Sequence, residues 1–117
     1  MQAPPDYRSP DGRFLVEWAE HSFVGNSTFV QPRVTDHATG DVLLDLWGAG
    51  SFGWFAWVVG AEGPVLALGV GRVMSGSGCT VVIDADARTY AIRDAKRAGK
   101  GLDHVRERLA IGGLAGA

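Results

Sequence analysis

SPDGRFLVEW, residues 9–18, combines a tight turn with the start of a β-strand. In the turn, proline presets the backbone torsion and glycine adopts a positive φ at little cost. The residues that follow alternate in polarity and place Phe14, Val16 and Trp18 on one face, a period of two that is typical of a half-buried strand. The stretch therefore predicts an antiparallel hairpin near the beginning of the chain.

Further runs of strand-forming residues follow, and each is bounded by residues that favour turns. After a first strand at residues 13–24, the pattern predicts strands at residues 28–36, 41–47, 52–60, 65–73, 79–86 and 88–93. Pro32 lacks a backbone donor, which favours an edge position or a bulge. Short turns make sequential strands antiparallel neighbours. We therefore expect a mainly β fold, an antiparallel meander of about seven strands that forms a small barrel or sandwich.

The pattern changes near the C-terminus, where Leu102, Val105 and Leu109, and with them Ile111, recur at helical spacing. Two glycines follow and match a helix C-cap, so one short helix is expected. The remaining tail is weakly specified and is expected to be loose unless it packs on the domain. The predicted organisation is an N-terminal arm at residues 1–8, an antiparallel β domain at 9–94, and a linker, helix and loose tail at 95–117.

Length and composition restrict the function classes. The 117 residues indicate one domain, and the net charge of −2 gives no basic footprint for nucleic acid. Six Lys or Arg residues against three acids lie between Arg93 and Arg108, which favours a solvated helix face. Cys79 is the only cysteine, so no intramolecular disulfide can form. The first residues lack the pattern of a secretory signal, and a cytoplasmic location is expected.

Two turns carry a resemblance to a known family. Ser9, Pro10, Asp11 and Gly12 start a strand, and the turn Asp36–Thr39–Gly40 closes the second hairpin. This arrangement resembles a single blade of TolB-like β-propellers, and also small uncharacterised bacterial proteins with one copy of the pattern. It covers about residues 9–47 and consists of turn chemistry, without a catalytic residue. No second copy follows at blade spacing, so a stand-alone antiparallel sheet is expected rather than a propeller.

An enzyme is the weakest of the functional hypotheses. Residues 49–53 resemble a nucleophile elbow around Ser51, and Asp84 or Asp86 followed by His104 gives the chain order of an α/β-hydrolase triad. However, the elbow lies between a strand and a helix of a large parallel sheet, whereas a strand is predicted after Ser51. We therefore predict no catalytic residues, and a small hydrolase using Ser51 remains an alternative.

Metal and membrane sites are also disfavoured. His21, His37 and His104 lie far apart in the sequence, and a solvated turn explains Asp84 and Asp86 better than a cation site. No metal and no cofactor are predicted. Residues 46–61 carry no charge but are too short for a membrane helix, and a buried hairpin explains them better.

The tryptophans carry the strongest functional signal. Trp54 and Trp57 differ in parity, so on a regular strand they point to opposite faces. At least one of them is then directed away from the main core, where an exposed tryptophan suits a binding surface or the mouth of a cavity. The candidate binding residues are Trp18, Trp47, Trp54, Trp57 and, on the helix, Arg106.

These observations lead to two main hypotheses. The first is a non-enzymatic bacterial interaction domain that binds a protein partner through an aromatic sheet surface or the C-terminal helix, for example as an immunity-type inhibitor of a toxin. The second is a β-barrel carrier of a small apolar ligand. Pairing of exposed edge strands would also allow a homodimer. A preformed apolar cavity would favour the carrier, and a filled core with an exposed tryptophan would favour the partner binder.

Overall fold

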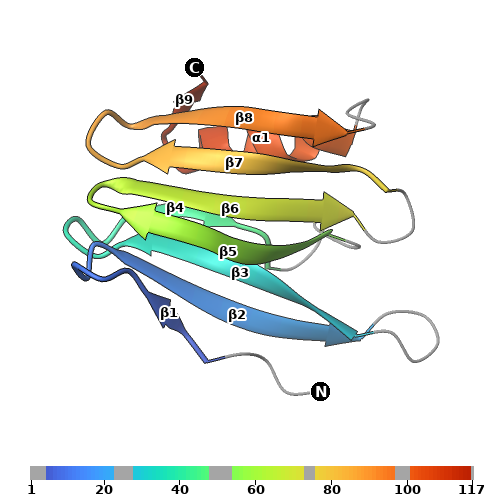
Figure 1. Cartoon of the computed structure of the whole chain (residues 1–117), viewed down its shortest axis with the longest axis horizontal. Helices are drawn as coiled ribbons and strands as arrows, with labels where there is room; N and C mark the ends of the chain where they lie inside the picture. The colour runs from blue at the N-terminus through green and yellow to red at the C-terminus, as the bar shows by residue number, and fades with distance from the viewer. Residues whose placement is uncertain (1–4, 23–27, 48–53, 73–75, 97–100, 117) are drawn as a thin grey trace.

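A computed structural model describes residues 5–22, 28–47, 54–72, 76–96 and 101–116 (Figure 1). Within these ranges the chain forms two β-sheets and one helix, as expected for a mainly β, antiparallel fold. The elements are β1 (Tyr7–Arg8), β2 (Phe14–Ser22), β3 (Thr28–Asp36), β4 (Val42–Asp45), β5 (Trp54–Glu62), β6 (Val65–Arg72), β7 (Gly78–Asp84), β8 (Thr89–Lys96), α1 (Gly101–Ile111) and β9 (Ala115–Gly116).

The first sheet contains β1 to β4 in chain order, with antiparallel neighbours throughout. Pro32 lies in β3, which is a central strand, so the expected edge position was wrong, and the irregularity of the β3–β4 ladder lies between Val34 and Thr35 rather than at Pro32. The strand accommodates proline because β4 pairs only as far as Arg33 and Asp45, and the carbonyl of Pro32 accepts from Leu46 N just beyond that ladder (3.0 Å). The backbone N–H that Pro32 lacks is therefore not needed for any regular pair between β3 and β4.

The second sheet contains β5 to β9 in chain order. The pairs from β5 to β8 are antiparallel, whereas β9 runs parallel to β8 through Thr89–Ala115 and Tyr90–Gly116. Strands β5 to β8 lie side by side in Figure 1, and α1 is drawn behind β7 and β8. The two sheets are separate hydrogen-bonded units, and β3 of the first sheet lies beside β5 of the second (Figure 1).

A single core joins the sheets and the helix. Alternate residues of β6 and β7 point inward, and Leu66, Leu68, Val81 and Ile83 are fully buried. The helix contributes its apolar stripe to the same cluster, and so do β2, β3 and β4. The buried helix residues are Leu102, Val105 and Leu109, as the helical spacing predicted, whereas Ile111 at the end of the stripe is exposed.

The C-terminal tail packs on the domain. Leu114 is buried, and its backbone N–H donates to the carbonyl of Leu109 in the 6→1 bond of a Schellman cap, with Gly113 at φ 79°. β9 then pairs with β8. The described residues form nine strands where about seven were expected, because two-residue strands such as β1 and β9 arise from tertiary pairing and leave no periodic pattern.

Candidate functional site

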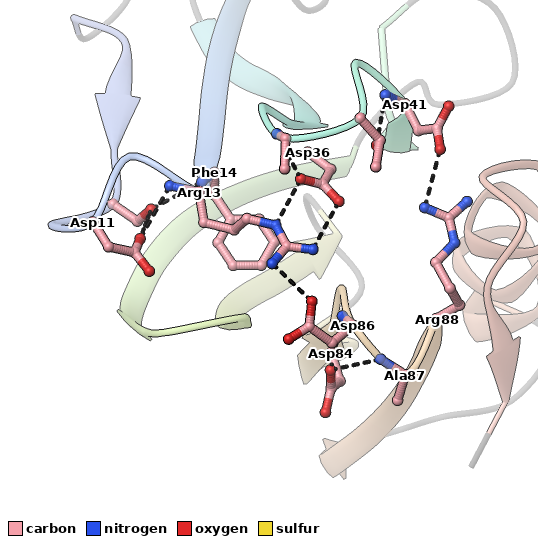
Figure 2. A network of polar contacts seen from close by, with 12 residues as sticks. Asp11, Arg13, Phe14, Asp36, Asp41, Asp84, Asp86, Ala87 and Arg88 are labelled. Atoms are coloured by element: carbon pink, nitrogen blue, oxygen red, sulfur yellow. Dashed lines mark hydrogen bonds and ion pairs between the residues drawn. The ribbon is translucent and has the colours of Figure 1, made fainter.

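The turns carry most of the charged contacts, and these contacts connect the sheets (Figure 2). Asp36, at the end of β3, is fully buried and accepts from both Nε (2.7 Å) and Nη2 (3.2 Å) of Arg13. Arg13 Nη1 lies 2.8 Å from Asp86 in the β7–β8 turn. One guanidinium therefore bridges a carboxylate of each sheet.

Asp36 also shapes its own turn. Its Oδ1 accepts from the backbone N–H of Ala38 (3.0 Å). The hydrogen bond from Arg13 holds the pKa of Asp36 below its ordinary value. Burial raises this pKa, but hydrogen bonds to the charged form outweigh it. Both oxygens of Asp36 are engaged by these contacts, which gives the carboxylate a structural role at this turn.

A second bridge lies at the same end of the molecule. Arg88 Nη1 donates to Asp41 (3.2 Å), and its Nη2 donates to the carbonyl of Gly112 (3.3 Å). Asp84 accepts from the backbone N–H groups of Asp86 and Ala87, both at 3.0 Å. These contacts make Asp84 a cap of the β7–β8 turn, which the sequence predicts at this place.

The outer face of the five-stranded sheet is different in character. We use this name for the side chains that alternate with the buried ones on β5 to β8. They are Phe55, Trp57, Val59, Ala67, Gly69, Gly71, Thr80, Val82, Ala91 and Arg93. Trp57 is 49% exposed and Val59 59% exposed, whereas Trp54 on the opposite face is only 2% exposed. The predicted opposite orientation of Trp54 and Trp57 is confirmed.

The aromatic rings of the outer face lie on glycines of the neighbouring strand. Gly69 is opposite Trp57, and a Cβ built on Gly69 would collide with the indole ring. A Cβ on Gly71 would lie 2.9 Å from the ring of Phe55. The two rings are 5.7 Å apart between centroids. Glycine in β6 thus allows both rings to lie against the sheet and to form a flat apolar surface.

A hollow lies beside Trp57 on this surface. It has a volume of about 240 Å³ and is lined by Trp57, Gly78, Cys79, Thr80, Asp94 and Lys96. A bulge between β7 and β8 opens the sheet here, and Asp94 takes a positive φ of 53°. Burial raises the pKa of Cys79, which keeps it a neutral thiol in the wall of the hollow.

The other predicted binding residues lie elsewhere. Trp54 belongs to the core, and Trp18 is half-buried against it. Trp47 donates its indole N–H to the carbonyl of Gln31 (2.9 Å) and stacks under the guanidinium of Arg33. Arg106 forms an exposed pair with Asp103 one turn earlier in α1. The structure therefore does not gather these residues with Trp57 into one site.

The residues of the hydrolase hypothesis are also dispersed. Ser51 lies outside the described residues, as does the side chain of His21, which was weighed only as a metal ligand. Asp84 and Asp86 lie in the β7–β8 turn, and Arg88 of this turn contacts Gly112 just after α1. His104 lies on α1 eight residues before Gly112, which is about 12 Å along the helix axis. Burial and the charge of Arg108 lower the pKa of His104. No acid–histidine pair forms between these residues.

Searches of the described part of the chain give two negative findings. No group of three or more His, Cys, Asp or Glu side chains could hold a metal ion. No helix in the described ranges is long and apolar enough to cross a membrane.

Comparisons with protein-family models, with curated proteins and with solved structures yield no match to this chain. The similarity of the two turns to a propeller blade therefore stays a prediction.

Sequence reasoning found Trp57 but missed its neighbours. Phe55, Val59 and the glycines of β6 complete the surface, and a signal for them was present. In β6 the inward residues are Leu66, Leu68 and Val70, and the alternate positions after Val65 hold only alanine or glycine. The small residues of β6 lie beside the two aromatic residues of β5 on the same face of the sheet. This combination indicates that the aromatic rings lie over the glycines.

Proposed function

We propose that this protein is a non-enzymatic interaction domain, and that the outer face of the five-stranded sheet binds a protein partner. The observation that carries the proposal is the position of Trp57, half exposed on a glycine floor. A flat, rigid aromatic ring gives a large contact area at little entropic cost, and tryptophan is enriched among residues that dominate binding energy.

The partner is a protein with an apolar side chain that fills the hollow beside Trp57. The rim of the hollow carries Lys96, and Arg93 lies nearby on the outer face opposite Thr80. Asp94 offsets one of these two positive charges. We therefore expect acidic residues beside the inserted apolar one, because complementary rim charges orient and accelerate association.

Stable protein interfaces combine a buried apolar centre with a polar rim. Trp57, Phe55 and Val59 supply the centre, and the ends of the strands supply the rim. Glu62 at the end of β5 and Asp84 at the end of β7 lie away from Lys96, so the outer face is acidic at one end and basic at the other. This polarity favours one orientation of the partner. Inhibition of a bacterial toxin is one version of the function, in which the partner surface surrounds the active site of the toxin.

The filled core supports partner binding over an interior carrier. The described side chains of the centre pack together, with Phe14, Trp54 and several leucines buried to 2% exposure or less. A buried ligand would need space among these side chains. The hollow beside Trp57 opens at the surface instead.

The test is native mass spectrometry of tagged protein purified gently from its own host. Wild type, Trp57→Ser and Arg106→Ser are compared, because Arg106 represents the alternative surface on α1. We expect a stoichiometric protein companion with wild type and Arg106→Ser, and its loss with Trp57→Ser. A bare chain from wild-type cells would contradict the proposal, as would a companion that Trp57→Ser retains. Loss of a homodimer instead would assign the outer face to a second copy of the chain.

A further inference from the structure

A second hollow lies on another side of the molecule, between β4 and the end of α1. It has a volume of about 350 Å³ and is lined by Arg33, Val42, Asp45, Arg108, Ile111 and Gly112. Its shape is fixed by a close approach of backbones, because a Cβ on Gly112 would collide with the carbonyl of Leu43. The volume is within the usual range of small-molecule sites.

Arg33 is held in one orientation at this hollow. Its guanidinium carbon lies 3.8 Å from the ring centroid of Trp47, and its Nε contacts Asp45 Oδ2 at 3.3 Å. Trp47 is itself anchored through its indole N–H on Gln31. Nε is the only atom of Arg33 in a polar contact with the part of the chain that the structure describes. Both terminal amino groups therefore remain available for a ligand.

The charges around the hollow favour an anion. Arg33 and Arg108 contribute two positive charges against the single carboxylate of Asp45. Both oxygens of Asp45 are engaged, Oδ1 by the backbone N–H of Trp47 (2.8 Å) and Oδ2 by Arg33. The carbonyl end of a helix disfavours anions, but here Arg88 donates to the carbonyl of Gly112 and reduces that effect.

Apolar surface borders the same arginine. Val42 is 40% exposed and Ile111 is 70% exposed, and both line the hollow. Together with Trp57 and Val59 they are the exposed large hydrophobic side chains of the described residues. A planar guanidinium with two available amino groups matches the geometry of a carboxylate. The aliphatic side chains next to it match a hydrocarbon chain.

We propose that this hollow binds a carboxylate that carries an apolar chain, with Arg33 on the carboxylate and Val42 and Ile111 against the chain. Asp45 and Trp47 are positioning residues, because they orient Arg33 from behind. Two sources share this chemistry: a small organic or fatty acid, and the free C-terminus of a peptide that ends in an aliphatic residue. The site is separate from the outer face and does not depend on the function proposed for it.

The test measures binding of octanoate by titration calorimetry, with octylamine as a probe of equal chain length and opposite charge. We expect saturable binding of octanoate and none of octylamine. Arg33→Gln is expected to weaken octanoate binding about tenfold or more, because hydrogen bonds between charged groups are lost. Arg106→Gln is the matched control, since it removes the same charge from an exposed position of α1 and leaves binding unchanged.

Ile111→Ser tests the apolar wall without altering any charge. It is expected to weaken octanoate binding and to leave acetate binding unaffected, and thermal unfolding confirms that each variant is folded. Absence of octanoate binding to the wild type would overturn the proposal. Equal binding of octanoate and octylamine, or equal affinity in Arg33→Gln, would also overturn it.

An acetylated peptide that ends in Leu-Leu distinguishes a small acid from a peptide C-terminus as the ligand. The peptide is tested once with a free C-terminal carboxylate and once as the C-terminal amide. Tighter binding of the free peptide than of octanoate assigns the site to a protein C-terminus. Tighter binding of octanoate assigns it to a small acid. Equal binding of the free and amidated peptides would contradict recognition of the carboxylate in a peptide.

Discussion

The turn cluster around Arg13 and the outer face around Trp57 differ in how far their side chains are engaged by other parts of the chain. In the turn cluster, a buried carboxylate meets a guanidinium and backbone donors, and every contact joins parts of this chain. On the outer face, a large aromatic ring rests on glycine and leaves half of its surface exposed. The comparison teaches that the charged residues of the turn cluster are engaged by other parts of the chain, whereas the ring of Trp57 keeps an apolar surface exposed.

The largest expected effect on stability comes from a substitution that breaks the turn cluster. Asp36→Ala removes the carboxylate that holds Arg13 and the Ala38 N–H, and we expect a loss of about 2–4 kcal/mol in the free energy of unfolding. Urea denaturation measures it. Asp103→Ala, which removes an exposed carboxylate paired with Arg106, is the control, with an expected change of about 0.5 kcal/mol or less. Equal effects of the two variants would mean that burial of Asp36 contributes nothing.

A smaller loss of stability, also caused by Asp36, is expected at acidic pH. The pKa of Asp36 is lower in the folded chain than the unfolded value of about 3.9, so its contribution is present above that value. As the pH falls below about 5 the contribution declines, and it is lost when the folded carboxyl is protonated. Thermal unfolding from pH 7 to pH 3 measures this decline.

The matched variant for the acid experiment is Asp36→Asn. It removes the titrating group, so its midpoint is expected to fall less steeply with acid than that of the wild type. Some dependence remains, because a hydrogen bond from the backbone N–H of Arg13 also lowers the pKa of Asp11. Parallel curves for the two proteins would show that Asp36 is not linked to stability.

Substitution at Gly69 sharpens the comparison on the outer face. Gly69→Ala places a methyl group where the indole of Trp57 lies, and we expect a loss of about 1–2 kcal/mol as the ring is displaced. In a Trp57→Ser background the same change is expected to be neutral or to stabilise by about 0.5 kcal/mol, because alanine restricts the unfolded chain. A double-mutant cycle in urea tests this sign change, and equal effects in both backgrounds would refute it.

The smallest expected effect on stability is that of Trp57→Ser alone. Because half of the ring is already exposed, the free energy of unfolding is expected to fall by about 1 kcal/mol or less. A loss of several kcal/mol, measured in urea, would place Trp57 with the core and would remove the contrast between the two regions.

Local patterns predicted most of the elements. Alternation placed Phe14 and Val16 in the core, and helical spacing placed Leu102, Val105 and Leu109 there. Parity separated Trp54 from Trp57. The failures concern contacts between distant segments: the pairing of β1 and β9, the central place of Pro32, and the packing of Leu114. No local pattern encodes these contacts, because each depends on a partner far along the chain.

The same distinction applies to the candidate sites. A strand period of two determines that two faces exist and which residues share each face. Only the tertiary structure decided that α1 and β4 share the core with one face of β5 to β8, which leaves Trp57 on the uncovered side. It also decided that Arg33 of β3, Val42 of β4 and Ile111 of α1 meet in one hollow. The sequence determined the strands, their turns and the helix, since these depend on neighbouring residues. The fold decided which surfaces are available, since covering a face requires non-local packing.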